Sequence, residues 1–256
     1  DALLQLNLAA AEDGQPGVFR YHKLFRAFLV SQLRATNPAR FKELNVAAAE
    51  LREGQQRIED ALYHLIQAGS WERVNEVIEK VGGRMFQEGR FHALVDWLDV
   101  IPPQAMAAEP NLLLWKARAL HYMNQFDAAL ALVAQAEQIF TARNDPLGRA
   151  SALAARGMAL RVKGDYEEAL GALQEALASL EAEGAAPAII AETRKELGMT
   201  LSRTTALNRA VEELTRVLEF FEGLGDEMAE ALVGDRVADF CPHPSAGDQA
   251  SFDRRA

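Results

Sequence analysis

Apolar and small residues recur along residues 110–220 at the spacing of paired helices, and the arrangement returns about every forty residues. The first copy consists of Leu113, Ala117, Leu120, Phe126, Ala129 and Ala136. The second consists of Leu153, Gly157, Leu160, Tyr166, Ala169 and Ala176. The third keeps Gly198, Leu201, Leu207, Ala210 and Val217. The small residues allow two helices to approach closely, and the large ones fill the space beside them.

This pattern is typical of tetratricopeptide-like units, in which a small residue of each helix faces its partner and a large residue opens the second helix. Such units stack into a solenoid with a concave binding wall. The sequence therefore predicts an all-α fold, a right-handed helical-repeat solenoid, whose main part is a recognition surface. A helical pattern that opens a fourth unit follows at Ala231 and Ala238.

The N-terminal region has a different period. Leu4, Leu6 and Leu8 alternate as in a strand over residues 3–8, a turn-rich DGQPG segment follows, and residues 18–21 indicate a returning strand. We expect this hairpin to be the only sheet and to rest on a helix from His22 to about Arg34. A hairpin followed by a helix resembles the last part of a winged-helix domain.

The middle of the chain predicts helices over about 38–52, 55–68 and 71–81, the first one capped by Asn37 with Pro38 in its first turn. Gly82-Gly83 and Gly89 are expected to bound a short helix. Another helix ends at Ile101-Pro102-Pro103, and helix continues to about Asp239. The predicted regions are a winged-helix end, an irregular helical-pair region, the repeats and an irregular tail, at residues 1–36, 37–108, 109–240 and 241–256.

Composition narrows the function classes. The net charge of −10 argues against a general nucleic-acid-binding surface. The single Cys241 excludes a disulfide framework, and no apolar run is long enough to span a bilayer. His64, His92 and His243 lack the spacing of metal ligands, and we expect no catalytic residues and no metal. Because the chain starts at Asp1 without a signal peptide, we interpret it as a piece of a longer cytoplasmic protein.

Two stretches together resemble a known family. Residues 19–29 read FRYHKLFRAFL, and residues 61–73 contain ALYH and AGSWER, followed by Trp97-Leu98 and Ile101-Pro102. Their order is similar to that in the large ATP-dependent LuxR-type transcriptional activators, the MalT-like group of signal-transduction ATPases. The resemblance covers roughly residues 3–240. The repeats alone are less specific than the first stretch, because many scaffold proteins carry them.

The resemblance implies an ATPase module and a winged helix before a helical-repeat sensor, with a DNA-binding helix-turn-helix at the end of the parent protein. The implied partners are a small-molecule inducer or a regulatory protein, and the ATPase module itself. This chain has no G-x4-GK[ST] phosphate loop, so ATP or ADP is implied for the parent only. We expect no cofactor, no direct DNA contact and no membrane contact here. His22 either contacts ADP phosphates in the intact protein or only packs at the strand–helix junction.

The first helix of each repeat is expected to present its positions 2, 5, 9, 12 and 13 to the concave wall, counted from Pro110, Ala150 and Ala191. The candidate ligand-binding residues are Arg118, His121, Tyr122, Met158, Arg161, Lys195, Met199 and Arg203. Arginine suits carboxylate or phosphate, and methionine adapts to apolar shapes. We expect an anionic inducer or an acidic partner segment, and little loss of stability on charge reversal at Arg161. Two alternatives remain open: a solvated face whose charges pair with glutamates, and a scaffold or co-chaperone that binds an acidic peptide.

Overall fold

The computed structural model describes residues 9–11 and 19–224, which divide into two compact units between Val81 and Gly82. In the first unit, strands β1 (Ala9–Ala11) and β2 (Phe19–Tyr21) pair antiparallel, with Ala10 opposite Arg20. The predicted first strand over residues 3–8 lies outside the described residues. Among the described residues, β2 pairs with residues 9–11. The structure therefore does not support the hairpin as predicted, and strands of three residues are too short to be stable alone.

Helix α2 (Lys23–Thr36) follows β2 and buries none of its residues within the described part of the chain. Leu24 is 74% exposed and Phe28 is 56% exposed, while the ring of Phe25 lies 5.6 Å from that of Tyr21. The predicted apolar side of this helix therefore exists, but most of it remains uncovered by the described residues.

The first unit continues with α3 (Pro38–Gly54), α4 (Ile58–Ala68) and the start of α5 (Trp71–Gln87). The predicted cap is confirmed, since the side chain of Asn37 accepts a hydrogen bond of 3.0 Å from the N–H of Arg40. Helices α3 and α4 pack against each other. The buried residues of this unit include Phe41, Ala49, Leu62, Leu65, Val74 and Ile78.

The expected break at Gly82-Gly83 is wrong, because α5 runs without interruption from Trp71 to Gln87. Gly82 instead provides a close approach. A Cβ atom at this position would lie 2.5 Å from Cζ3 of Trp115, well inside van der Waals contact. Glycine here allows the helix to pack against a tryptophan ring, so the sequence signal of a helix breaker was in fact a signal of packing.

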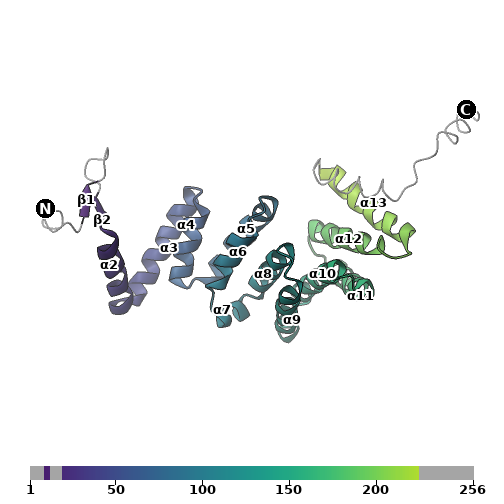
Figure 1. Cartoon of the computed structure of the whole chain (residues 1–256), viewed down its shortest axis with the longest axis horizontal. Helices are drawn as coiled ribbons and strands as arrows, with labels where there is room; N and C mark the ends of the chain where they lie inside the picture. Colours follow the sequence, from purple (N-terminus) through teal and green to yellow (C-terminus); the bar gives the residue numbers. More distant parts are fainter. Residues whose placement is uncertain (1–8, 12–18, 225–256) are drawn as a thin grey trace, which may run out of the picture. The chain divides into compact units, whose positions relative to one another are not determined.

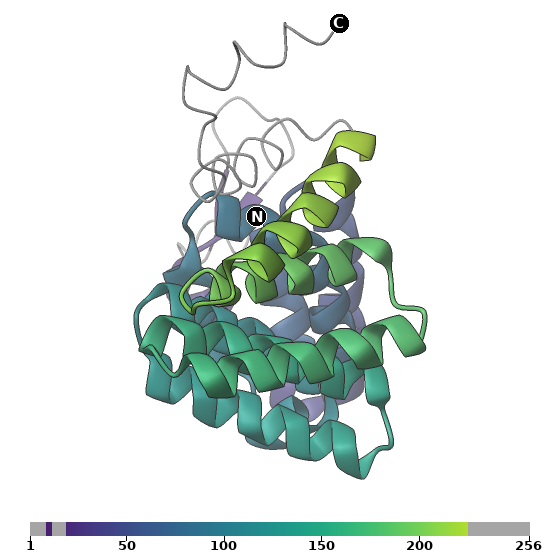
Figure 2. The same cartoon turned by 90° about the vertical axis from the view of Figure 1, so that its right-hand side faces the viewer.

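The second unit contains α6 (Phe91–Asp99) and the short α7 (Pro103–Ala108), followed by helices that pack pairwise in sequence order (Figures 1 and 2). The pairs are α8 (Pro110–Tyr122) with α9 (Phe126–Ala142), α10 (Pro146–Lys163) with α11 (Tyr166–Ala182), and α12 (Pro187–Leu201) with α13 (Leu207–Leu224). As predicted, Phe126, Tyr166 and Leu207 open the second helices. However, α10 and α12 begin at prolines four residues before the expected starts.

The repeat register is confirmed by its small residues. Ala129 is 1% exposed, and Ala169 and Ala210 are fully buried. A Cβ at Gly157 would lie 2.5 Å from Cγ of Leu173 and 3.1 Å from the carbonyl oxygen of Ala169. Each helix pair therefore packs closely at the position where the sequence repeats a small side chain.

Gly198 has the same relation to the third pair. A Cβ there would lie 2.7 Å from Cγ of Leu214 and 3.4 Å from the carbonyl oxygen of Ala210. The predicted helical residues 225–239 and the tail lie outside the described residues. The domain boundaries after residues 36, 108 and 240 stay predictions.

Candidate functional site

The candidate residues belong to the first helix of each pair, and these helices, α8, α10 and α12, pack next to one another in that order. Helix α8 carries Arg118, His121 and Tyr122, helix α10 carries Met158 and Arg161, and helix α12 carries Lys195 and Met199. Arg203 follows the end of α12. We call Arg118, His121, Tyr122 and Arg161 the central cluster, because their charges and rings act on one another.

Arg118 lies against aromatic rings. Its guanidinium carbon is 4.8 Å from the centre of the Phe86 ring and 6.0 Å from that of Trp115, within the range of cation–π attraction. No carboxylate among the described residues forms an ion pair with it. Its Nε atom is buried without a hydrogen-bond partner. The positive charge of Arg118 is therefore held by ring faces and not by a counterion.

His121 is buried beside this arginine, with 9% of the residue exposed. Its ring lies edge-on to Tyr122 at 5.6 Å and to Phe126 at 5.5 Å. Burial lowers the pKa of His121 to about 4, and the positive charges of Arg161 and Arg118 add to this effect. Its Nδ1 atom has no hydrogen-bond partner. His121 is therefore neutral near pH 7, with an unused polar atom.

Tyr122 extends the cluster into an aromatic surface. It is 47% exposed and stacks on Phe91 with ring centres 4.9 Å apart and planes inclined by 12°. Phe86 lies 5.3 Å from Tyr122 and 5.8 Å from Trp115. Phe86 therefore joins the ring stack to the guanidinium of Arg118. An apolar group placed on Tyr122 would lie near a cation.

Arg161 is already paired. Its Nε and Nη2 atoms donate to Oε2 of Glu196 at 3.1 and 3.0 Å, and the two side chains are only 15% and 11% exposed. The expectation of a small effect on charge reversal assumed an exposed arginine. Because breaking a buried pair leaves a charge without compensation, we now expect a substantial loss of stability.

The remaining candidates of α12 do not continue the cluster as one row of free cations. Lys195 donates to both carboxylate oxygens of Glu192, at 2.8 and 2.7 Å. Met199 is partly buried and packs against the buried cluster of Leu214 and Val217 on α13. Arg203 is exposed, and no described side chain pairs with it. Met158 is partly buried on α10.

His22 lies where the sequence placed it, directly before α2. Its side chain is exposed and makes no capping hydrogen bond, while its carbonyl oxygen accepts from the N–H of Arg26 at 2.9 Å. A contact with nucleotide phosphates stays a prediction.

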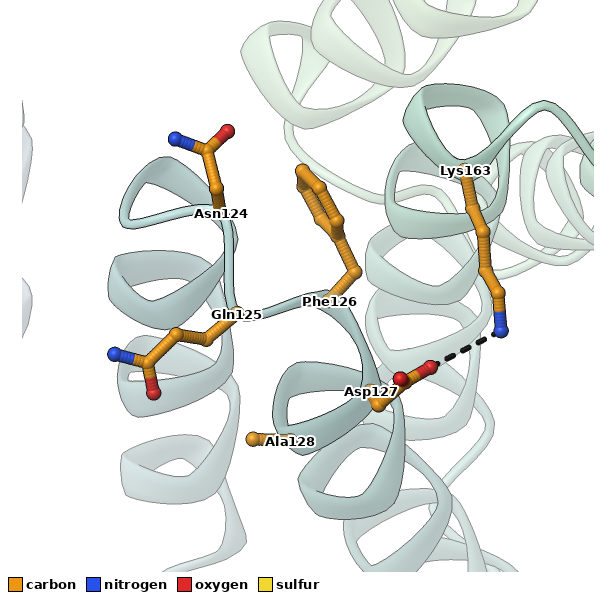
Figure 3. A pocket seen from close by; sticks show the side chains of 6 residues that line it. All are labelled: Asn124, Gln125, Phe126, Asp127, Ala128 and Lys163. Carbon is orange, nitrogen blue, oxygen red and sulfur yellow. Dashed lines mark hydrogen bonds and ion pairs between the residues drawn. The ribbon is translucent and has the colours of Figure 1, made fainter.

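A separate open pocket of about 350 Å³ lies at the turn between α8 and α9, next to the end of α10. Asp127 and Lys163 point toward each other at its side, with Nζ 3.0 Å from Oδ1 (Figure 3). The hydrogen bond to Asp127 and the charge of that carboxylate raise the pKa of Lys163. The two charged groups therefore neutralise each other at the surface of this pocket, in an exposed ion pair that contributes little to stability.

Sequence reasoning missed Phe86, Phe91 and Glu196. The glutamate is 35 residues from its partner in the chain, and no pattern links the two. Phe86 and Phe91 fall in the predicted irregular region, where no sequence pattern relates them to Tyr122. Only the packing of α5 and α6 with α8 fixes the positions of their rings relative to Tyr122.

The described residues contain no cluster of three or more side chains that could hold a metal ion. Among the described helices, none has the length and apolar character of a membrane span.

Comparison with known proteins shows homologues named HTH-type transcriptional regulator MalT. The protein of Vibrio cholerae serotype O1 is 25% identical over 217 residues, which are 82% of this chain and 24% of that protein. The protein of Vibrio parahaemolyticus is 26% identical over 222 residues, with the same coverage of both chains. That of Klebsiella pneumoniae strain 342 is 26% identical over 151 residues, or 59% and 17% of the two chains. The chain spans about a quarter of the length of the first two relatives.

No protein-family profile matches the chain. Among solved structures, the fragment of MamA from residue 41 to its end, from Desulfovibrio magneticus RS-1, has a TM-score of 0.48 and 19% identity over 72% of this chain and 96% of that one. BtubC from P. vanneervenii has a TM-score of 0.43 and 14% identity over 85% and 90% of the two chains.

Proposed function

We propose that this chain, homologous to about a quarter of the MalT regulators, is the signal-sensing and protein-interaction region of an ATP-dependent transcriptional activator. The homology over 82% of the chain carries the proposal. The structure supports it with consecutive helix pairs whose first helices place polar and aromatic side chains close together. In this proposal the region binds an inducer or a regulatory protein in the cytoplasm and has no catalytic role.

The N-terminal part supports a connection to further domains. The apolar residues Leu24 and Phe28 of α2 are exposed, and soluble proteins usually cover such side chains when several lie on one helix. We propose that α2 belongs to the end of a winged-helix domain and that an ATPase module lies before it in the parent. His22 would then lie at a nucleotide-dependent contact. Ligand binding would reach the ATPase as a difference in free energy between two arrangements of the parent.

The domains of the parent protein and its response to ligands test this function. Its gene is expected to encode a phosphate loop before this segment and a helix-turn-helix after it. A thermal-shift screen of bacterial metabolites against the chain should find a stabilising compound, since a ligand at 100 times its dissociation constant adds about 2.7 kcal/mol. In a transcription reporter, deletion of residues 110–224 should then abolish the response to that compound. A parent that lacks both the phosphate loop and the helix-turn-helix would refute the proposal, and so would a response that survives the deletion.

A further inference from the structure

We propose that the central cluster binds one carboxylate group of a small molecule with an aromatic or apolar body, and that Arg118 is the cation that holds it. This inference rests on the proposed sensing function and names the ligand class of that site. Its first support is charge balance. Arg161, Arg194 and Lys195 each lie against a glutamate, whereas no described carboxylate pairs with Arg118. One partly buried positive charge is therefore left without a counterion.

The second support is a pair of unused polar atoms. Nε of Arg118 and Nδ1 of His121, three residues apart on α8, are both buried without hydrogen-bond partners. Buried polar atoms without partners are rare, and each one destabilises the empty site. A carboxylate oxygen accepts from Nε and, in the tautomer that carries its proton there, from Nδ1 of the imidazole. A carboxylate therefore has the hydrogen-bonding chemistry that each of the two atoms lacks.

A ligand gains access to these buried atoms when the side chain of Arg118 moves. Both polar atoms are closed to solvent, and the guanidinium lies over Phe86. Among the described residues only ring contacts hold this side chain, so it can turn toward a ligand without breaking an ion pair. The more strongly held Arg161 stays on Glu196 during this change. The side chain of Arg118 can therefore move when a ligand binds, whereas that of Arg161 keeps its position.

The third support concerns the body of the ligand. Tyr122 is exposed and lies flat on Phe91, and Phe86 connects this stack to Arg118. A planar or apolar group gains area on this surface while its carboxylate reaches the guanidinium. The charge favours a single carboxylate over a phosphate, because Arg118 is the one cation of the cluster without a described counterion, whereas Glu196 already neutralises Arg161.

The test uses phenylacetate, with phenylacetamide as its uncharged isostere and inorganic phosphate as the competing anion. Each is titrated into the isotopically labelled chain, and the NMR signals of the arginine Nε–H groups and histidine rings are followed. Phenylacetate should shift the signals of Arg118 and His121 and saturate, and phenylacetamide should bind at least tenfold more weakly. Equal affinity for both compounds, binding of phosphate alone, or no saturation with phenylacetate would overturn the proposal.

A matched pair of variants locates the site. Arg118→Met removes the charge and keeps an apolar stem beside Phe86, and it should weaken phenylacetate binding at least tenfold. Arg209→Met removes an exposed cation of α13 that is not among the candidate ligand-binding residues, and it should leave the affinity unchanged. Equal loss in the two variants would indicate general charge attraction and overturn the assignment. If Arg118→Met does not fold, the signals of the unaltered chain decide alone.

The pKa of His121 provides a second readout. The charged groups that act on this ring are Arg118 on its own helix and Arg161 on α10, with Glu196 of α12 behind the latter, while α9 contributes the uncharged ring of Phe126. A bound carboxylate opposes the two arginines and should raise the pKa of His121 in the presence of saturating phenylacetate. An unchanged pKa would contradict binding at this place. Should carboxylate binding fail while residues 110–224 still carry the reporter response, the sensing function stands and only the ligand class is wrong.

Discussion

Replacing Gly157 by alanine tests the helix packing on which the repeat register depends. The new Cβ would lie 2.5 Å from Cγ of Leu173, about 1 Å closer than the roughly 3.5–4.0 Å of a favourable carbon–carbon contact. It would also lie 3.1 Å from the carbonyl oxygen of Ala169. Leu173 is fully buried, so neither its Cγ nor the backbone of α11 can move away freely. Helices α10 and α11 must shift apart or repack.

The magnitude follows from two opposing effects. Overpacking of a tight core costs about 1–3 kcal/mol, and a glycine-to-alanine change inside a helix gains about 1 kcal/mol. Gly171, inside α11, provides the matched control, because a Cβ there meets nothing within 4 Å. Gly171→Ala should therefore gain about 1 kcal/mol. The difference in unfolding free energy between the two variants, about 1–3 kcal/mol, isolates the packing cost.

Urea unfolding followed by circular dichroism measures this difference, with the unfolding slope checked for each variant. Gly198→Ala should fall between the two, since its Cβ would be 2.7 Å from Leu214 and 3.4 Å from the nearest backbone oxygen. If Gly157→Ala is as stable as Gly171→Ala, the close approach of the helices is wrong.

Three further outcomes are expected. Ala169→Leu should destabilise the chain by about 1–3 kcal/mol in the same urea assay, because Ala169 is fully buried. Arg161→Glu should lower the free energy of unfolding by about 3 kcal/mol, since it places a second carboxylate against Glu196. The double variant Arg161→Glu/Glu196→Arg should recover part of this loss. Equal stability of the single and the double variant would refute the pairing. His121 is neutral in the folded chain down to a pKa of about 4, whereas the unfolded chain binds the proton near pH 6.5. Stability should therefore fall by about 1–3 kcal/mol as the pH drops from 6.5 to 4, and His121→Gln should remove most of this loss, as urea melts at several pH values will show.

The sequence was sufficient to predict the helix pairs and the residues at which they touch. Small residues at a fixed spacing have one simple cause, close packing, so Ala169 and Gly157 could be assigned without a structure. The same reasoning failed at Gly82, because glycine both ends helices and permits close contact. Only the ring of Trp115, distant in sequence, distinguishes these two uses.

The candidate site was predicted less completely, because side-chain partners depend on contacts between helices. The helix and approximate position of Arg161 followed from counting, but its neutralisation by Glu196 did not. Met199 was predicted to face the ligand wall, and the sequence pattern does not reveal that it also packs against the buried cluster of Leu214 and Val217. Lys195 is the exception: its partner Glu192 lies three residues away on the same helix, a spacing that sequence alone can recognise.

The most direct test of the central claim is a transcription reporter driven by the parent protein carrying Arg118→Met, compared with the same protein carrying Arg209→Met. The reporter is induced with the stabilising compound from the thermal-shift screen, and the basal output of each variant is recorded. Loss of induction in Arg118→Met, with Arg209→Met still inducible, is the result that we predict. Normal induction in Arg118→Met would contradict a sensing role for the central cluster.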